Sequence, residues 1–226
     1  MSHDKIIDYY NSLAQTYDEN RFGNSYGQFI DRQERRVLNK LLSPLTEQRH
    51  VLEIACGTGR LTNYATHALD ASEQMMAIAQ EKHKNVSFTL ASAADTGFQD
   101  ETFDAVFSFH LMMHLDNETI ESICKEAHRI LKPGGQFIFD IPSRKRRELF
   151  HHKQDGWHGA THLSADEVKQ LAGTRFKVNR SAGIMMMPVH KLPKVMRKPL
   201  VSTDYLLANS PIKQYSSYLV YELVKQ

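Results

Sequence analysis

Three kinds of feature are scarce in this chain of 226 residues, and each absence excludes a class of protein. Only two cysteines occur, Cys56 and Cys124, far apart and without the spacing of a zinc site, so we expect neither a disulfide framework nor a metal centre. No apolar run approaches the ~20 residues that span a bilayer. The first ten residues are polar and lack the pattern of a signal peptide. We therefore expect a cytoplasmic protein whose thiols are reduced.

The net charge is only +2, but it is unevenly distributed along the chain. Residues 1–142 contain 13 lysines and arginines against 20 acidic residues, whereas residues 143–226 contain 15 against 6. A basic C-terminal part indicates either an anionic partner or a solvated basic surface.

Short apolar runs and helical patterns alternate along the chain. Apolar residues recur at helical spacing between Ile6 and Leu42, which predicts two N-terminal helices. Alternation then predicts a doubly wound, mostly parallel α/β sheet with helices on both faces. The expected strands are residues 50–55, 65–69, 86–90, 105–109, 136–141, 176–178 and 218–224, and the clearest helix is residues 117–131.

We expect a single domain over residues 1–226 with three parts, namely N-terminal helices (1–45), a core (46–142) and C-terminal strands (143–226). A capping box at Ser164 and Glu167 predicts a helix in the last part. Residues 181–214 contain four prolines and several lysines, which predict an irregular basic insertion between the last two strands.

The clearest chemical signal is the segment 51–60, where an apolar strand breaks into a glycine turn that we expect to open a helix. Glycines allow the backbone to approach a ligand, and doubly wound folds bind nucleotides beyond the carboxyl ends of their strands. The third glycine of a dinucleotide-binding turn is missing, because Gly59 is followed by Arg60, Leu61 and Thr62. This spacing disfavours a nicotinamide-dependent dehydrogenase.

The order of motifs resembles that of the class I S-adenosylmethionine (SAM)-dependent methyltransferases. The shared features are Glu53 two residues before Ala55-Cys56-Gly57-Thr58-Gly59, Asp70 at the end of the second strand, the loop 91–98, the strand beginning Phe103-Asp104-Ala105-Val106, and Leu131-Lys132-Pro133-Gly134-Gly135 before the fifth strand. The resemblance runs from about Tyr9 to Ile141. It implies a Rossmann-like fold, SAM as cofactor and methyl transfer as the reaction.

The resemblance assigns particular residues to SAM. Glu53 and the glycine turn hold its amino-acid end, Asp70 accepts hydrogen bonds from the ribose hydroxyls, and Met75 packs on the adenine. The alternatives are a helix N-cap for Asp70 and a core side chain for Met75. The full set is Glu53, Ala55, Gly57, Thr58, Gly59, Asp70, Ala71, Met75, Ser92, Ala93, Ser108 and Tyr17.

Two features depart from the family pattern. Ser92 stands where an acidic residue is usual, so the backbone amide of Ala93 or the side chain of Asp95 is a second candidate for reading the adenine. Asp70 follows Glu53 by 17 residues, and the family usually has roughly six more between these carboxylates. Either the intervening helix and strand are short or part of the loop is absent.

Catalysis by such a protein depends chiefly on orientation, because SAM is already activated. If the acceptor must lose a proton, the candidate bases are His110 and His114, just beyond the fourth strand. The alternative is ordinary packing for both. Tyr9, Tyr10 and Tyr17 lie in a segment that resembles the lid of small-molecule methyltransferases, although they also fit the apolar face of a helix.

We therefore expect methyl transfer to a small-molecule or lipid-like acceptor, apolar or anionic, as in the quinone-biosynthesis methyltransferases. The alternatives are an RNA methyltransferase, for which no RNA-binding motif is present, and a non-catalytic SAM-binding protein. We expect no DNA partner and leave the oligomeric state open. The methionine-rich basic stretch 185–198 fits a cap over the acceptor or a patch on an anionic membrane surface.

Overall fold

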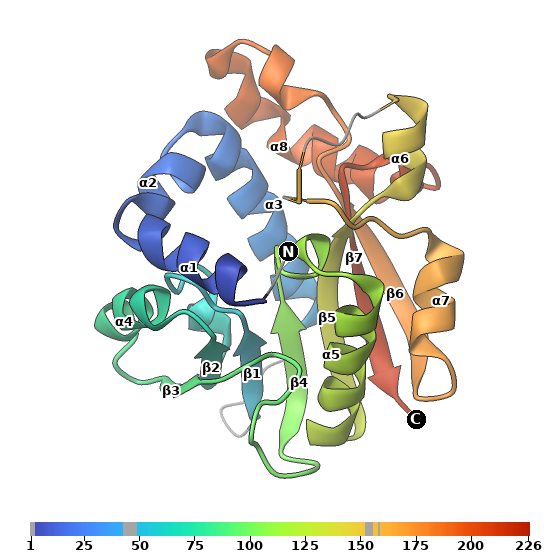
Figure 1. Ribbon diagram of the computed structural model, residues 1–226. Coiled ribbons are helices and arrows are strands. Elements are labelled where there is room, and N and C mark those ends of the chain that lie inside the picture. Colours follow the sequence, from blue (N-terminus) through green and yellow to red (C-terminus); the bar gives the residue numbers. More distant parts are fainter. Residues whose placement is uncertain (1–2, 43–48, 152–155, 158) are drawn as a thin grey trace.

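The computed structural model describes residues 3–42, 49–151, 156–157 and 159–226 (Figure 1). Its centre is a sheet in the order β3-β2-β1-β4-β5-β7-β6, in which β1 to β5 are parallel and β7 is antiparallel to both neighbours. This confirms the Rossmann-like, mostly parallel fold. The strands are β1 (Val51–Ile54), β2 (His67–Asp70), β3 (Ser87–Leu90), β4 (Phe103–Ser108), β5 (Leu131–Pro142), β6 (Phe176–Ile184) and β7 (Tyr218–Lys225).

Helices cover both faces of this sheet. They are α1 (His3–Leu13), α2 (Tyr17–Phe22), α3 (Ser25–Leu41), α4 (Glu73–Lys82), α5 (Asn117–Ile130), α6 (Arg144–Leu149), α7 (Ala165–Ala172) and α8 (Lys194–Ala208). The predicted capping box at Ser164 and Glu167 is present at the start of α7. The N-terminal segment forms three helices rather than the predicted two, because the short helix α2 lies between the two predicted ones. Asn24 separates α2 from α3 by capping α3, where its side chain accepts the N–H groups of Tyr26 and Gly27.

The two faces of the sheet build the two largest cores. Side chains of α5 and α7 pack with Phe137 and Phe139 on one face. Side chains of α3 pack with Phe107 and Ile138 on the other. Because successive residues of a strand point to opposite faces, β5 contributes alternately to both cores.

No α-helix follows the glycine turn, contrary to the prediction. A single 3₁₀ turn, Thr62–Tyr64, stands in its place. Only residues 55–66 connect β1 to β2, which is close to the minimum length of a crossover between parallel strands. This short connection explains the reduced spacing between Glu53 and Asp70. The turn is held by α3 instead, since Arg35 donates to the carbonyl of Arg60 and to Asn63 Oδ1.

The insertion between β6 and β7 is helical, so its predicted irregular structure is also wrong. Helix α8 continues through Pro199, whose missing N–H and ring contacts cost about 3 kcal/mol in a helix interior. The fully buried Asp204 offsets this cost by accepting hydrogen bonds from Gln33 Nε2 and from the backbone N–H groups of Met186 and Met187. These contacts fix α8 against α3.

Both cysteines are buried and unpaired. Burial raises the pKa of the Cys124 thiol to about 12, so this group stays protonated at neutral pH. Of the helices that the structure describes, none has the length and apolar character needed to cross a bilayer.

Candidate active site

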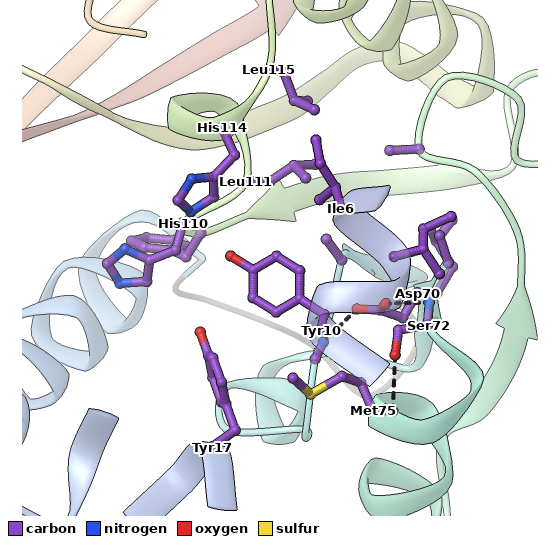
Figure 2. Close-up of a pocket in the computed structure, with 17 residues that line it drawn as sticks. Ile6, Tyr10, Tyr17, Asp70, Ser72, Met75, His110, Leu111, His114 and Leu115 are labelled. Carbon is purple, nitrogen blue, oxygen red and sulfur yellow. Dashed lines mark hydrogen bonds between the residues drawn. The ribbon is translucent and has the colours of Figure 1, made fainter. Parts of the chain in front are cut away.

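A pocket lies at the carboxyl ends of the parallel strands, between α1, the turn after β1, the start of α4 and the exit of β4 (Figure 2). A recess beside the turn adjoins it, and both are lined by Tyr17, Ala55, Gly57, Phe109 and His110. The pocket is lined by Ile6, Ile7, Tyr10, Tyr17, Ala55, Gly57, Leu69, Asp70, Ala71, Ser72, Met75, Ala93, Phe109, His110, Leu111, His114 and Leu115.

The two glycines of the turn serve different purposes. Gly57 has φ +56°, and a Cβ at this position would meet no atom within 4 Å, so the backbone borders open space in the pocket. Gly59 has φ +82°, and its Cβ would lie 3.0 Å from Ala79 Cβ, so glycine is needed there for packing on α4. Only Gly57 leaves room for a ligand.

Asp70 links the turn after β1 to the start of α4 by two hydrogen bonds. Its Oδ2 accepts the Gly57 N–H at 2.7 Å and its Oδ1 accepts the Ser72 N–H at 2.8 Å. Burial raises the pKa of Asp70, although these hydrogen bonds oppose the shift. The N-cap of α4 is Ser72, whose Oγ accepts the Met75 N–H, so the N-cap interpretation of Asp70 is wrong. The carboxylate remains in the pocket wall.

Glu53 lies in the adjoining recess and is almost completely buried. Burial raises the pKa of its carboxyl to about 8, even though the hydroxyl of Thr62 donates to it and lowers the pKa. At neutral pH Glu53 is therefore largely protonated, and a nearby cation would favour its ionised form.

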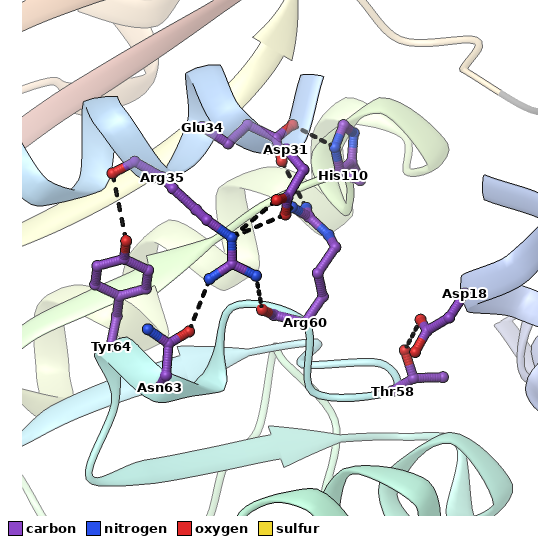
Figure 3. Close-up of polar contacts among 9 residues, drawn as sticks. All are labelled: Asp18, Asp31, Glu34, Arg35, Thr58, Arg60, Asn63, Tyr64 and His110. Atoms are coloured by element: carbon purple, nitrogen blue, oxygen red, sulfur yellow. Dashed lines mark hydrogen bonds and ion pairs between the residues drawn. The ribbon is translucent and has the colours of Figure 1, made fainter. Parts of the chain in front are cut away.

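A buried network of charges joins α3 to the turn and to the end of β4 (Figure 3). Arg60 contacts Glu34 Oε2 at 2.6 Å and Asp31 Oδ1 at 2.7 Å. The other oxygen of Glu34 lies 2.6 Å from His110 Nε2. Beyond it, Asp140 at the end of β5 accepts the backbone N–H of His110 at 2.7 Å.

His110 is enclosed by carboxylates on both sides. Its Nδ1 lies 3.6 Å from Asp140 Oδ2, and its backbone has φ +60°. Burial lowers the pKa of His110, but the negative charges of Glu34 and Asp140 outweigh it, and the net shift is upward. Burial likewise raises the pKa of Glu34, yet Arg60 and His110 bring it down to about 2. The arrangement favours an imidazolium at this position, which has no lone pair to offer as a base.

His114 is held differently. Its Nδ1 accepts the backbone N–H of Gly159 at 3.0 Å, and its ring lies edge-on to Trp157 at 5.6 Å between centroids. A neutral imidazole that accepts at Nδ1 carries its proton on Nε2. His114 is therefore arranged to donate a hydrogen bond.

Helix α1 covers the pocket through Tyr10. The ring of Tyr10 stands between Asp70 and His110 in Figure 2, and it contacts Tyr17 at 6.1 Å between centroids. Asn11 fixes the helix because its Oδ1 accepts the hydroxyl of Ser72 at 2.6 Å. Tyr9 lies outside and is 39% exposed.

The structure gathers most of the predicted site residues at this edge of the sheet. The pocket and its recess are lined by Tyr17, Glu53, Ala55, Gly57, Thr58, Asp70, Ala71, Met75, Ala93, His110 and His114. Gly59, Ser92 and Ser108 line neither space, nor does Asp95. Ser92 instead accepts the Ala94 N–H, and Ser108 is fully buried. Within the described ranges, no residue after Leu115 lines the pocket.

Sequence reasoning missed the charge network and the contact of Trp157 with His114. One signal was available for the network, because Glu34 falls on the apolar stripe of its helix, four residues after Ile30 and three before Val37. A carboxylate on such a stripe needs a buried cation. Trp157 offered no comparable signal, since its contact depends on the path of the chain after α6.

Comparisons with known proteins find similarity in the central part of the chain. Residues 52–139 match a family model described as a methyltransferase domain. The chain is 33% identical over 151 residues to malonyl-[acyl-carrier protein] O-methyltransferase of Marinomonas sp., covering 61% of this chain and 54% of that protein. It is 31% identical over 147 residues to demethylmenaquinone methyltransferase of Tropheryma whipplei, covering 61% and 59%. The match thus spans between half and three fifths of these relatives.

Solved structures extend the likeness over the remaining chain. Magnesium protoporphyrin IX methyltransferase of Synechocystis PCC 6803, solved with S-adenosylhomocysteine (SAH), has a TM-score of 0.69 at 14% identity and full coverage of both chains. A SAM-dependent methyltransferase of Archaeoglobus fulgidus has a TM-score of 0.64 at 16% identity, covering 92% and 98%. At such identities the likeness concerns the fold. The chain therefore contains a segment similar to methyltransferase domains over residues 52–139, and it shares the fold of SAM-dependent methyltransferases.

Proposed function

We propose that this protein transfers the methyl group of SAM to a small-molecule acceptor. The observation that carries the proposal is the pairing of Gly57 and Asp70 in one pocket wall. Gly57 leaves its backbone accessible to a ligand, and Asp70 presents a carboxylate beside it. The relatives named above act, by their names, on a demethylmenaquinone, a malonyl-carrier protein and a porphyrin. Their variety supports a methyltransferase function and leaves the acceptor to be found.

The residues of the pocket fit SAM in kind. Asp70 offers the remaining lone pairs of its two oxygens to the ribose hydroxyls, while Met75 and Ala93 give an apolar slot for the adenine. Glu53 and Thr58 in the adjoining recess suit the amino-acid end, whose ammonium group would draw the Glu53 carboxyl into its ionised form. Tyr17 borders both spaces and closes the site on the side of α2.

The acceptor enters from the opposite side of the pocket. Ile6, Leu111 and Leu115 make this side apolar, as a ring or chain would require. SAM supplies an activated methyl group, which leaves sulfur as the acceptor's electron pair forms the new bond to carbon. Acceleration then depends on how well the walls orient the acceptor and exclude water.

The two histidines have different roles in the pocket. His114 donates a hydrogen bond into the acceptor side and so orients an oxygen or nitrogen of the acceptor. His110 keeps its proton and holds the exit of β4 in place through Glu34 and Asp140. A proton lost by the acceptor leaves to solvent, since neither ring is arranged as a base.

Two measurements test the proposal. SAM and SAH should raise the melting temperature of the protein, and a hundredfold excess over the dissociation constant corresponds to about 2.7 kcal/mol of stabilisation. NAD is the control ligand and should leave the melt unchanged. A panel of quinols, carrier-bound carboxylates and porphyrins incubated with methyl-labelled SAM should then yield a labelled product. Melts that respond to NAD but not to SAH would contradict the proposal.

A further inference from the structure

Helix α8 has an apolar outer face that the described part of the chain leaves uncovered. Val195 is 81% exposed and Leu206 is 70% exposed, although both side chains are aliphatic. Single exposed apolar side chains are ordinary, but a group of them on one element marks an interaction surface. Among the described residues, nine large apolar side chains are exposed, and five of them come from α8 and the turn after it, namely Val195, Met196, Leu206, Leu207 and Ile212.

The spacing of these residues places them on one stripe of the helix. Val195 and Leu206 are eleven residues apart, as are Met196 and Leu207, and eleven residues make about three turns of an α-helix. The members of each pair therefore lie above one another on the same face. The stripe is completed by uncharged residues, Pro199, Ser202 and Thr203.

The opposite side of α8 is fixed against α3. Asp204 lies nine residues after Val195, or about two and a half turns, so it points away from the stripe. Its fully buried carboxylate accepts a hydrogen bond from Gln33 Nε2, and the neighbouring ring of Tyr205 lies 4.1 Å from the guanidinium carbon of Arg36. Turning α8 to bury the stripe would break these contacts and expose its inner side. The exposure of the stripe therefore follows from how α8 is held.

Cations border the stripe on one side. Lys194 and Lys198 are exposed and lie one turn apart at the start of α8, and Lys191 in the turn before it is exposed as well. Residues 185–215 contain five lysines and arginines against one acidic residue, Asp204, which is buried. The surface around the stripe is therefore positive.

The topology places α8 beyond the edge of the sheet that carries the pocket. Strands β5 and β6 are both antiparallel to β7, so they run in the same direction and end at the same edge. Helix α8 lies between the end of β6 at Ile184 and the start of β7 at Tyr218. Figure 1 shows α8 at this end of the sheet together with α6, whose last residues, Leu149 and Phe150, are also exposed.

We propose that the outer face of α8, together with Ile212, docks on the surface of a lipid bilayer that contains anionic headgroups. This inference goes beyond methyl transfer and does not depend on it. An apolar helical stripe bordered by lysines is typical of helices that lie in a membrane interface. There the apolar side chains enter the acyl boundary, while the lysine stems extend and bring their ammonium groups to the phosphates.

The charges favour a bilayer over the other occupants of such a face. A second copy of the chain, bound by a two-fold contact through α8, would bring Lys194 and Lys198 against the same lysines of its partner. A nucleic acid would meet the lysines through its phosphates, but its backbone would leave Val195 and Leu206 without an apolar partner. An anionic bilayer satisfies both the stripe and its border.

The test is flotation of the full chain with vesicles of two compositions, phosphatidylcholine alone and equal parts of phosphatidylcholine and phosphatidylglycerol. The protein should bind the anionic vesicles and bind the neutral ones more weakly. The double variant Val195→Gln/Leu206→Gln removes two apolar side chains from the stripe and should weaken binding to anionic vesicles about tenfold. Leu90→Gln is the matched control, because Leu90 is 52% exposed at the end of β3, and it should change binding less than about twofold.

A second pair of variants tests the charges. Lys194→Gln/Lys198→Gln should weaken binding to anionic vesicles about tenfold at low salt, and the difference should shrink at high salt. Lys84→Gln/Lys177→Gln removes the same charge from exposed positions outside the face and should change binding less than about twofold. All these side chains are exposed, so the melting temperature should stay at the wild-type value in every variant.

Several results would overturn the proposal. One is a wild type that does not bind anionic vesicles, or that binds the two compositions equally. Another is binding that is unchanged in Val195→Gln/Leu206→Gln, which would leave only a charged surface. Sedimentation of the wild type as a dimer and of this variant as a monomer, without vesicle binding, would assign the face to a second copy of the chain.

Discussion

Two halves of the molecule differ in the sign of their charges. The pocket and its recess contain the carboxyls of Glu53 and Asp70 above β1 and β2, whereas α6, which follows β5, carries the guanidinium groups of Arg146 and Arg147 outside both spaces. The same contrast runs through the sequence, acidic before residue 143 and basic after it. SAM carries a sulfonium and an ammonium against one carboxylate, so a cationic cofactor suits the acidic half. The basic half is suited to an anion.

The halves meet at the network of Arg60, Glu34, His110 and Asp140, where charges of both signs alternate. Its members come from α3, the glycine turn, β4 and β5. Substituting any one of these four residues tests whether the difference in charge between the two halves depends on the network.

The largest effect should follow Glu34→Gln. This change leaves Arg60 and His110 buried with less opposing charge, and breaking a buried pair typically costs about 3–5 kcal/mol. Urea unfolding at pH 6 should show this loss, while Glu118→Gln, at an exposed position of α5, should cost less than about 0.5 kcal/mol. A loss below 1 kcal/mol would show that the network contributes little to stability.

The same variant should alter the pH dependence of stability. The pKa of His110 is raised by folding, so its contribution is complete below its unfolded pKa of about 6.5 and is lost as pH rises through the folded value. The wild type should therefore lose stability on the alkaline side of neutrality, and Glu34→Gln should lose less. Parallel curves for the two proteins would contradict the imidazolium assignment.

Next in size is the effect of Asp70→Ala on the acidic half. Losing a charged acceptor of the ribose hydroxyls should cost about 1.5–3 kcal/mol of SAH binding, or roughly 10- to 150-fold in affinity. Ser92→Ala should change the affinity less than about twofold, because Ser92 does not line the pocket. Calorimetry with SAH compares them, and equal losses would give Ser92 a share in adenine recognition.

A smaller effect concerns the protonation of Glu53. Its pKa of about 8 in the folded protein means that SAM, by bringing an ammonium group close, should displace a proton at pH 7. SAM affinity should accordingly rise with pH between 6 and 8, by at most about tenfold per unit. Titrations in buffers of different ionisation enthalpy measure the released proton, and Glu53→Gln should abolish the release. Release that persists in this variant would have to come from another group.

The smallest effect is expected from the basic insertion. Replacing Lys191, Lys194, Arg197 and Lys198 by glutamine should raise the KM for an anionic acceptor only about two- to threefold at low salt, since α8 does not line the pocket. SAM affinity should be unchanged, and the difference should fade at high salt. A tenfold rise that persists in salt would place the insertion in direct contact with the acceptor.

Sequence reasoning succeeded where structure depends on neighbouring residues. The strands β1 to β5, the cap of α7 and the placement of Gly57 beside Asp70 all follow from local patterns of apolar, glycine and capping residues. It failed where contacts distant in sequence decide the outcome. Asp204 fixes α8, which contains a proline, by accepting a hydrogen bond from Gln33 on α3. Helix α3 also holds the turn after Gly59, where a helix was expected. The acidic half of the site was therefore predictable, whereas Arg146 and Arg147 gave no local sign of their position.

The short connection between β1 and β2 also bears on how the chain is made. Helix α3 covers the sheet face where the missing helix would have packed, through contacts to Phe107 and Ile138. On the ribosome this amphipathic helix emerges well before those partners. At 5–20 residues per second, the roughly 100 residues between them take on the order of 5–20 s to synthesise. During that interval the apolar face of the helix, with Phe29, Val37 and Leu38, has no sheet to pack against.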